Sequence, residues 1–142
     1  MTGRIFPDTN ILIYLYSESE PLKREVACRI LNAAACVTSL QAMREASNVW
    51  FKKHGWDGAK IRKHIDNIEL VCDAVLPIGR TEINLALSLK DQYGYSCYDS
   101  LMLASALESD CEEIIAEDMA DGHVIRDRLK IRSPFSQLEA GH

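Results

Sequence analysis

Residues 6–16, FPDTNILIYLY, place two polar residues, Asp8 and Asn10, between two apolar runs. Residues 4–7 predict a short buried strand that ends at Asp8, and a helix is predicted from about Asn10. A buried element would ordinarily continue with apolar residues, so an aspartate at the end of this strand requires an explanation. That explanation depends on whether other carboxylates occupy similar positions further along the chain.

Short apolar strands alternate with amphipathic helices along the rest of the chain. Further strands are predicted at 35–37, 71–78 and 113–116. This alternation is typical of an α/β protein that has a parallel sheet with helices on both faces. No repeat or linker interrupts the 142 residues, so we expect one domain over 1–142, with a frayed tail from about residue 136.

Several helices carry recognisable end signals. Thr38 and Gln41 form a capping-box pattern at the start of a helix that Gly55 can end. Thr81 is expected to cap a later helix, and Asp99 lies in the first turn of an apolar helix.

Composition and charge limit the class of protein. Hydrophobic residues make up 47% of the chain and the net charge is −5, values that fit a folded acidic protein. No signal-peptide pattern is visible, and the longest early apolar run, 11–16, is too short to span a bilayer. We therefore expect a soluble cytoplasmic protein without membrane contact. The five scattered cysteines predict reduced core thiols rather than a disulfide framework or a zinc site.

Four carboxylates stand at strand ends and helix starts. Asp8 follows the first strand, Glu45 lies about two turns into the helix after the second, and Asp118 follows the strand at 113–116. Asp99 begins a helix. Right-handed crossovers bring the carboxyl ends of parallel strands to one edge, where such sheets bind ligands. We therefore expect the four side chains to meet in one crevice.

A cluster of this kind requires neutralisation. Two unit charges 4 Å apart repel by about 4 kcal/mol at an effective dielectric constant near 20. Oxygen-only ligands, without Cys or His pairs, favour Mg²⁺ or Mn²⁺ over zinc. Such an ion supports hydrolysis of phosphodiesters.

Each acid also has an ordinary structural explanation. Asp8 can cap a helix, Asp99 can complement a helix dipole, Glu45 can be a surface residue and Asp118 can form a turn. Two other functions stay open. An Asp-nucleophile phosphatase would use Asp8, although Asn10 stands where such enzymes have a second acid, and a catalytically silent domain would only bind a protein partner.

Four stretches carry a resemblance to a known family. The chain resembles the PIN-domain nucleases, and in particular the VapC-type toxins of toxin–antitoxin pairs, from Arg4 to about Phe135. The phrase YDSLMLASAL and the closing EDMADG are more specific than the opening DTN. The matching stretches are FPDTNILIYLY, SLQAMREASNVW, CYDSLMLASALESDC and IIAEDMADGHVI.

The resemblance implies a three-layer α/β/α fold with a parallel sheet of about five strands. It also implies Mg²⁺- or Mn²⁺-dependent endoribonuclease activity, a homodimer, and inhibition by a cognate antitoxin whose tail enters the acidic cleft. Asp8 and Asp99 would hold the metal most directly, while Glu45 and Asp118 would complete its shell through water or orient the attacking hydroxide. Asn10 would support the first acid.

One residue departs from the family pattern. Ala116 stands where the family often has Ser or Thr, two residues before the last acid, which affects fine positioning. Glu117 and Asp121 lie close enough in sequence to share the role of Asp118.

A basic stretch lies within this acidic chain. Between Arg44 and His64, six Lys and Arg residues stand against two acids, a net charge of +4. This stretch could contact RNA phosphates, with Trp56 stacking on a base, or it could be the solvated outer face of a helix pair.

Overall fold

The computed structural model describes residues 3–136, and between these limits the chain forms six helices and six strands. The predicted frayed tail from about residue 136 falls almost entirely outside the described residues. The helices are α1 (Thr9–Tyr14), α2 (Pro21–Ala33), α3 (Leu40–His54), α4 (Gly58–Val71), α5 (Arg80–Tyr93) and α6 (Cys97–Glu108), and the strands are β1 (Ile5–Pro7), β2 (Val37–Ser39), β3 (Ala74–Leu76), β4 (Glu113–Ile115), β5 (Val124–Ile125) and β6 (Leu129–Arg132).

The strands confirm the predicted α/β fold with a central parallel sheet. Within residues 3–136, one four-stranded sheet has the order β1-β4-β6-β5, in which β5 alone runs antiparallel. A second pair, β2 and β3, is parallel, and a bridge between Ile5 and Cys36 joins it to β1. The expected sheet of about five strands is therefore divided into a four-stranded and a two-stranded part.

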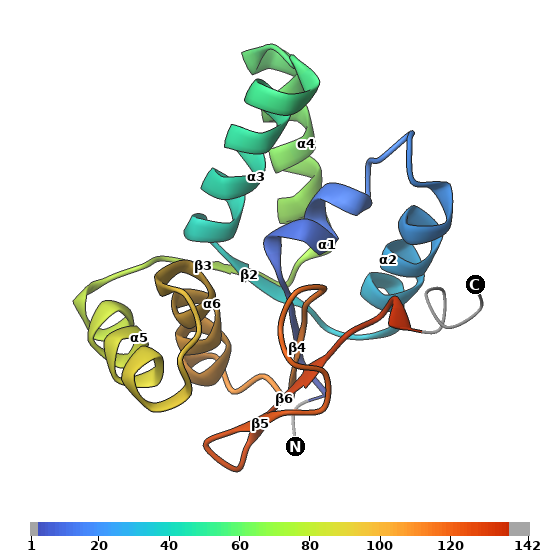
Figure 1. Cartoon of the computed structure of the whole chain (residues 1–142). Helices are drawn as coiled ribbons and strands as arrows, with labels where there is room; N and C mark the ends of the chain where they lie inside the picture. Colours follow the sequence, from blue (N-terminus) through green and yellow to red (C-terminus); the bar gives the residue numbers. More distant parts are fainter. Residues whose placement is uncertain (1–2, 137–142) are drawn as a thin grey trace.

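Helices cover this sheet on both sides (Figure 1). α6 packs against β2 and β4 and is backed by α5, whereas α1 packs against β1 and contacts α2 on the opposite side. α3 and α4 pair as a hairpin that rises beyond the carboxyl end of β2 (Figure 1). The three-layer arrangement places apolar side chains between the layers, among them the fully buried Phe6, Leu12, Leu103, Ile114 and Ile115.

Polar residues at the strand ends determine where the helices begin. The Asp8 carboxylate accepts a hydrogen bond from the Thr9 N–H at the start of α1, and Ser39 Oγ accepts one from Ala42 N–H at the start of α3. Ser39 rather than the predicted Thr38 therefore caps α3. Thr38 lies in β2, where its side chain is buried.

The other helix ends follow the same rules with one further correction. The cap of α5 is Gly79, not the predicted Thr81, because the helix begins at Arg80. Gly55 and Gly94 end α3 and α5 with φ of 66° and 81°, a conformation that favours glycine. Among the described residues, no helix combines the length and apolar character needed to cross a bilayer.

Candidate active site

A pocket of about 620 Å³ lies at the carboxyl ends of β1, β2 and β4. Parallel pairing of β1 with β4 places Pro7 opposite Ile115, so both chains leave the sheet at the same level. The four predicted acids all line this pocket, although they lie far apart in the sequence. We call it the acidic pocket, and its lining consists of Asp8, Thr9, Asn10, Gln41, Arg44, Glu45, Asn48, Val49, Tyr98, Asp99 and Asp118.

Asp8 is the most deeply placed of the acids. Its side chain is only 8% exposed, and its Oδ1 lies 2.7 Å from the Thr9 nitrogen. Burial raises the pKa of Asp8 to about 7, and repulsion from Asp99 and the other two acids adds to the shift, while the Thr9 hydrogen bond opposes it. Asp8 is therefore both the cap of α1 and an acid whose negative charge lacks compensation.

Glu45 is held by two neighbours. The Thr9 hydroxyl donates to Glu45 Oε2 over 2.7 Å, and the Gln41 amide donates to Oε1 over 3.1 Å. Gln41 lies one turn earlier on α3, so the helix itself supplies this contact. Both carboxylate oxygens are thus oriented by the protein.

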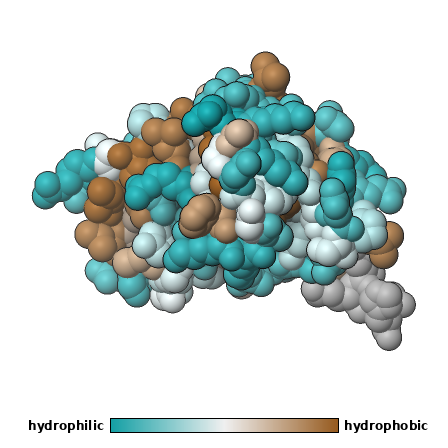
Figure 2. Space-filling model, turned by 90° about the horizontal axis from the view of Figure 1, so that it is seen from above, coloured by the Kyte–Doolittle hydropathy of each residue, from teal (hydrophilic) through white to brown (hydrophobic). Residues whose placement is uncertain are grey.

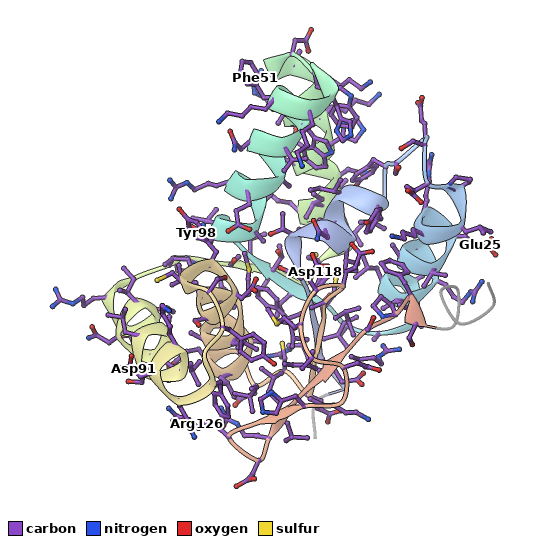
Figure 3. All side chains as sticks on the ribbon, in the orientation of Figure 1. Glu25, Phe51, Asp91, Tyr98, Asp118 and Arg126 are labelled. Carbon is purple, nitrogen blue, oxygen red and sulfur yellow. The ribbon has the colours of Figure 1, made fainter. Side chains whose placement is uncertain are left out.

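Asp99 and Asp118 complete the cluster from the other elements. Asp99 lies in the first turn of α6, where Ser96 Oγ accepts a hydrogen bond from its N–H. Burial raises the pKa of Asp99, and repulsion from Glu45 and Asp118 adds to it. Figure 3 shows Asp118 in the loop beyond β4, close to α1.

Asn10 supports a different acid from the expected one. Its amide lies 3.2 Å from Asp118 Oδ2, so it orients the last acid rather than Asp8. Asn10 therefore connects α1 to the loop beyond β4.

The donor set of the pocket fits a hard divalent cation. Carboxylate oxygens are the ligands that Mg²⁺ and Mn²⁺ prefer, and the raised pKa of Asp8 reports charge that a cation would compensate. As placed, no three Asp, Glu, His or Cys side chains within residues 3–136 approach closely enough to enclose an ion. Glu45 in particular is occupied by its contacts with Thr9 and Gln41.

Glu117 and Asp121, the other two acids of the EDMADG phrase, have partners outside the acidic pocket. Glu117 accepts a hydrogen bond from Tyr14 and pairs with Lys23 at 2.6 Å. Asp121 Oδ1 accepts a hydrogen bond from the Ser133 N–H over 2.8 Å. Neither side chain lines the acidic pocket. Ala116 is fully buried, and its N–H donates a hydrogen bond to the Arg132 carbonyl at the end of β6.

Several lining residues were not among the predicted site residues, and Arg44 was predicted only as part of the basic stretch. Thr9 belongs to the DTN phrase and Gln41 precedes Glu45 by one helical turn, and these spacings could have identified both. Arg44 and Tyr98 lie next to predicted acids in sequence. Tyr98 is 62% exposed and lies at the start of α6, beside the lower end of α3 in the view of Figure 3, where it lines the acidic pocket.

The basic stretch contributes little to this pocket. Among its described residues, Arg44 is the one cation that lines the pocket. Trp56 stacks on Trp50 with centroids 5.2 Å apart, and the Lys60 ammonium lies 4.4 Å from the Trp56 centroid. The Trp56 ring is therefore used in packing the α3–α4 hairpin.

The fold and the pocket together define an α/β protein with a cluster of carboxylates at the carboxyl edge of a parallel sheet. The PIN domain family matches residues 5–120, which is most of the chain. The chain belongs to the PIN domain family, and the resemblance noted in the sequence is confirmed.

Solved structures of toxin–antitoxin proteins resemble this one. A toxin–antitoxin complex from Klebsiella pneumoniae has a TM-score of 0.69 at 22% identity, covering 92% of this chain and 97% of that chain. VapBC2 from Rickettsia felis, bound to a DNA fragment from its promoter, has a TM-score of 0.64 at 11% identity, covering 92% and 99%. At such low sequence identities, the structural similarity shows only that these proteins share a fold with this chain.

A third structure is VapC20 from Mycobacterium tuberculosis, which its description calls a sarcin-ricin loop cleaving toxin. It has a TM-score of 0.61 at 18% identity and covers 78% of this chain and 86% of that chain. No curated protein sequence matches the chain at a significant level.

Proposed function

We propose that this protein is a metal-dependent endoribonuclease and the toxin of a toxin–antitoxin pair. The observation that carries the proposal is the meeting of Asp8, Glu45 and Asp99 with Asp118 in the acidic pocket. Membership of the PIN domain family and the likeness to toxin–antitoxin structures support it.

The four acids have distinct roles in this proposal. Asp8 and Asp99 would hold a Mg²⁺ or Mn²⁺ ion, because both carboxyl groups lie in the pocket beside the other acids, where a cation would offset their mutual repulsion. When bound, the ion supplies positive charge to the phosphodiester and makes water more acidic. Glu45, fixed by Thr9 and Gln41, would orient the attacking water, and Asp118 would complete the site from the loop beyond β4.

Two residues at the rim would contact the RNA. The Arg44 guanidinium suits a phosphate next to the scissile one, since it is the cation within the described lining of the acidic pocket. The exposed Tyr98 ring offers a surface on which a base can stack. Together they would place a nucleotide across the carboxylates.

The proposed protein partner is the cognate antitoxin. A second groove, about 560 Å³ in volume, adjoins the acidic pocket and shares Arg44 and Asn48 with it. This groove between α3 and α4 exposes Leu40 and Phe51, which are 49% and 64% exposed. An antitoxin segment with apolar residues for the groove and a cation for the acidic pocket would match both surfaces.

We also propose a homodimer that acts in the cytoplasm, where RNA and antitoxin are available. Figure 2 shows hydrophobic surface gathered toward the side on which α5 lies in Figure 1. On α5, Ile83 and Leu87 are 43% and 52% exposed, and burying such apolar surface favours association. Light scattering of the purified chain measures its mass and tests this assembly.

Incubation of purified protein with total RNA tests the proposed activity. We expect cleavage with Mg²⁺ or Mn²⁺ and its loss with EDTA. A folded protein that cuts no RNA with either ion but still binds a small protein encoded beside it would be the inactive binding domain instead. Trapping of phosphate on Asp8 would point to the phosphatase alternative.

A further inference from the structure

Two buried cysteines lie in contact at the base of the α3–α4 hairpin. Cys36 precedes β2 and Cys72 is the C-cap residue of α4, and their sulfurs are 3.2 Å apart. Their exposed fractions are 1% and 6%. Neither side chain lines the acidic pocket, so the proposed nuclease function does not account for this pair.

The backbone fixes the two residues beside each other. The Asp73 N–H donates to the Cys36 carbonyl over 2.8 Å, and the next residues pair as parallel strands with Val37 opposite Ala74. A disulfide has an S–S length of about 2.0 Å, so the sulfurs need to approach by only about 1 Å. The two side chains already point toward each other, with their sulfurs in contact.

We propose that Cys36 and Cys72 are a modification site at which a thiol oxidant forms a reversible disulfide. With diamide, two S–H bonds break and one S–S bond forms, and two electrons and two protons pass to the diamide, which becomes a hydrazine. With hydrogen peroxide, the same two electrons and two protons yield two waters. A dithiol reductant reverses the bond.

The contact between the two sulfurs supplies both steps of the reaction. The first of the two thiols to ionise attacks the oxidant, and the other thiol, whose sulfur lies 3.2 Å away, displaces the activated group.

The bond would close a loop at the base of a functional segment. Residues 37–71 lie between the two cysteines and comprise β2, α3 and α4, including Glu45. Linking the ends of this segment restricts the unfolded chain and so favours the folded hairpin. We expect the melting temperature of the oxidised protein to rise by about 5 °C or more.

Peptide mapping of the folded full-length protein tests the proposal. The Cys28→Ser/Cys97→Ser double variant is treated with diamide, alkylated in denaturant and digested with trypsin. Cys36 and Cys72 fall in separate tryptic peptides, 30–44 and 64–80. We expect these two peptides to be linked, with a mass about 2 Da below their sum, and dithiothreitol to release them.

Cys111 is the matched internal control. Its thiol is also buried, but its contact at 3.3 Å is the Ser109 hydroxyl, which cannot form a disulfide. We expect Cys111 to remain fully alkylated after oxidation. Alkylation of Cys36 and Cys72 after diamide treatment, or a link from Cys36 to Cys111, would overturn the proposal. This result does not depend on RNA cleavage and so is separate from the proposed function.

Discussion

The Thr9 hydroxyl donates a 2.7 Å hydrogen bond to Glu45 Oε2, linking residues 36 positions apart in the sequence. Thr9 directly follows Asp8. Two adjacent residues therefore do both tasks: Asp8 caps α1, and Thr9 orients Glu45 on α3. This contact makes Thr9 a positioning residue for the proposed reaction.

We expect Thr9→Val to lower kcat for RNA cleavage about tenfold with little change in KM. The substitution keeps the shape of a buried side chain but leaves Glu45 without its hydroxyl partner. Thr9→Ser, which keeps the hydroxyl, should restore most of kcat. Steady-state kinetics on one RNA substrate measure both variants, and equal activity of Thr9→Val and wild type would rule out the positioning role.

Asp8 should make stability depend on pH when divalent ions are absent. Its folded pKa of about 7 exceeds the ordinary value of 3.8, so the folded state binds the proton more tightly than the unfolded state. Stability is therefore lost as pH rises from about 4 to about 7. We expect Asp8→Asn to remove this loss, so that its stability relative to wild type rises by about 2–3 kcal/mol from pH 5 to pH 8.

Urea unfolding in EDTA at the two pH values measures this effect. The exposed Asp91→Asn is the control and should follow wild type. Added Mg²⁺ or Mn²⁺ should stabilise wild type more than Asp8→Asn at pH 8. A wild-type stability that does not fall over this range, relative to Asp8→Asn, would contradict the uncompensated charge at Asp8.

Rim residues should affect substrate binding more than the chemical step. We expect Arg44→Ala to raise KM for RNA about tenfold, and Tyr98→Ala to raise it about fivefold, with smaller changes in kcat. Tyr98→Phe keeps the aromatic ring and should behave as wild type. Lys53→Ala is the control, since Lys53 is an exposed cation on the same helix that does not line the pocket. Equal effects of Arg44→Ala and Lys53→Ala would indicate general charge attraction instead.

Much of the fold follows from local sequence signals. The strand before Asp8 and the helix ends at Gly55 and Gly94 were predictable, because apolar runs and glycine have direct backbone consequences. The cap at Ser39 was missed by one position, because Thr38 and Ser39 both carry a hydroxyl and the strand register decides between them. The cap at Gly79 was missed by two positions, because glycine has no side chain that could signal a cap in the sequence.

The candidate site was predictable as a set of acids but not as a network. Parallel strand order brings Asp8 and Asp118 to one edge, which pattern analysis can anticipate. The partners of each acid depend on side-chain contacts between distant elements, such as Asn10 with Asp118. Contacts of that kind leave no local pattern in a single sequence.

Two matched variants test the central claim, that the carboxylates of the acidic pocket perform metal-dependent RNA cleavage. Asp99→Asn removes a pocket carboxylate, whereas Asp121→Asn changes an acid that bonds Ser133 outside the pocket and keeps that bond through its amide oxygen. RNA cleavage with Mn²⁺ is measured for both, alongside their circular dichroism. We predict no detectable cleavage by folded Asp99→Asn and near wild-type cleavage by Asp121→Asn. Wild-type cleavage by folded Asp99→Asn would contradict the account.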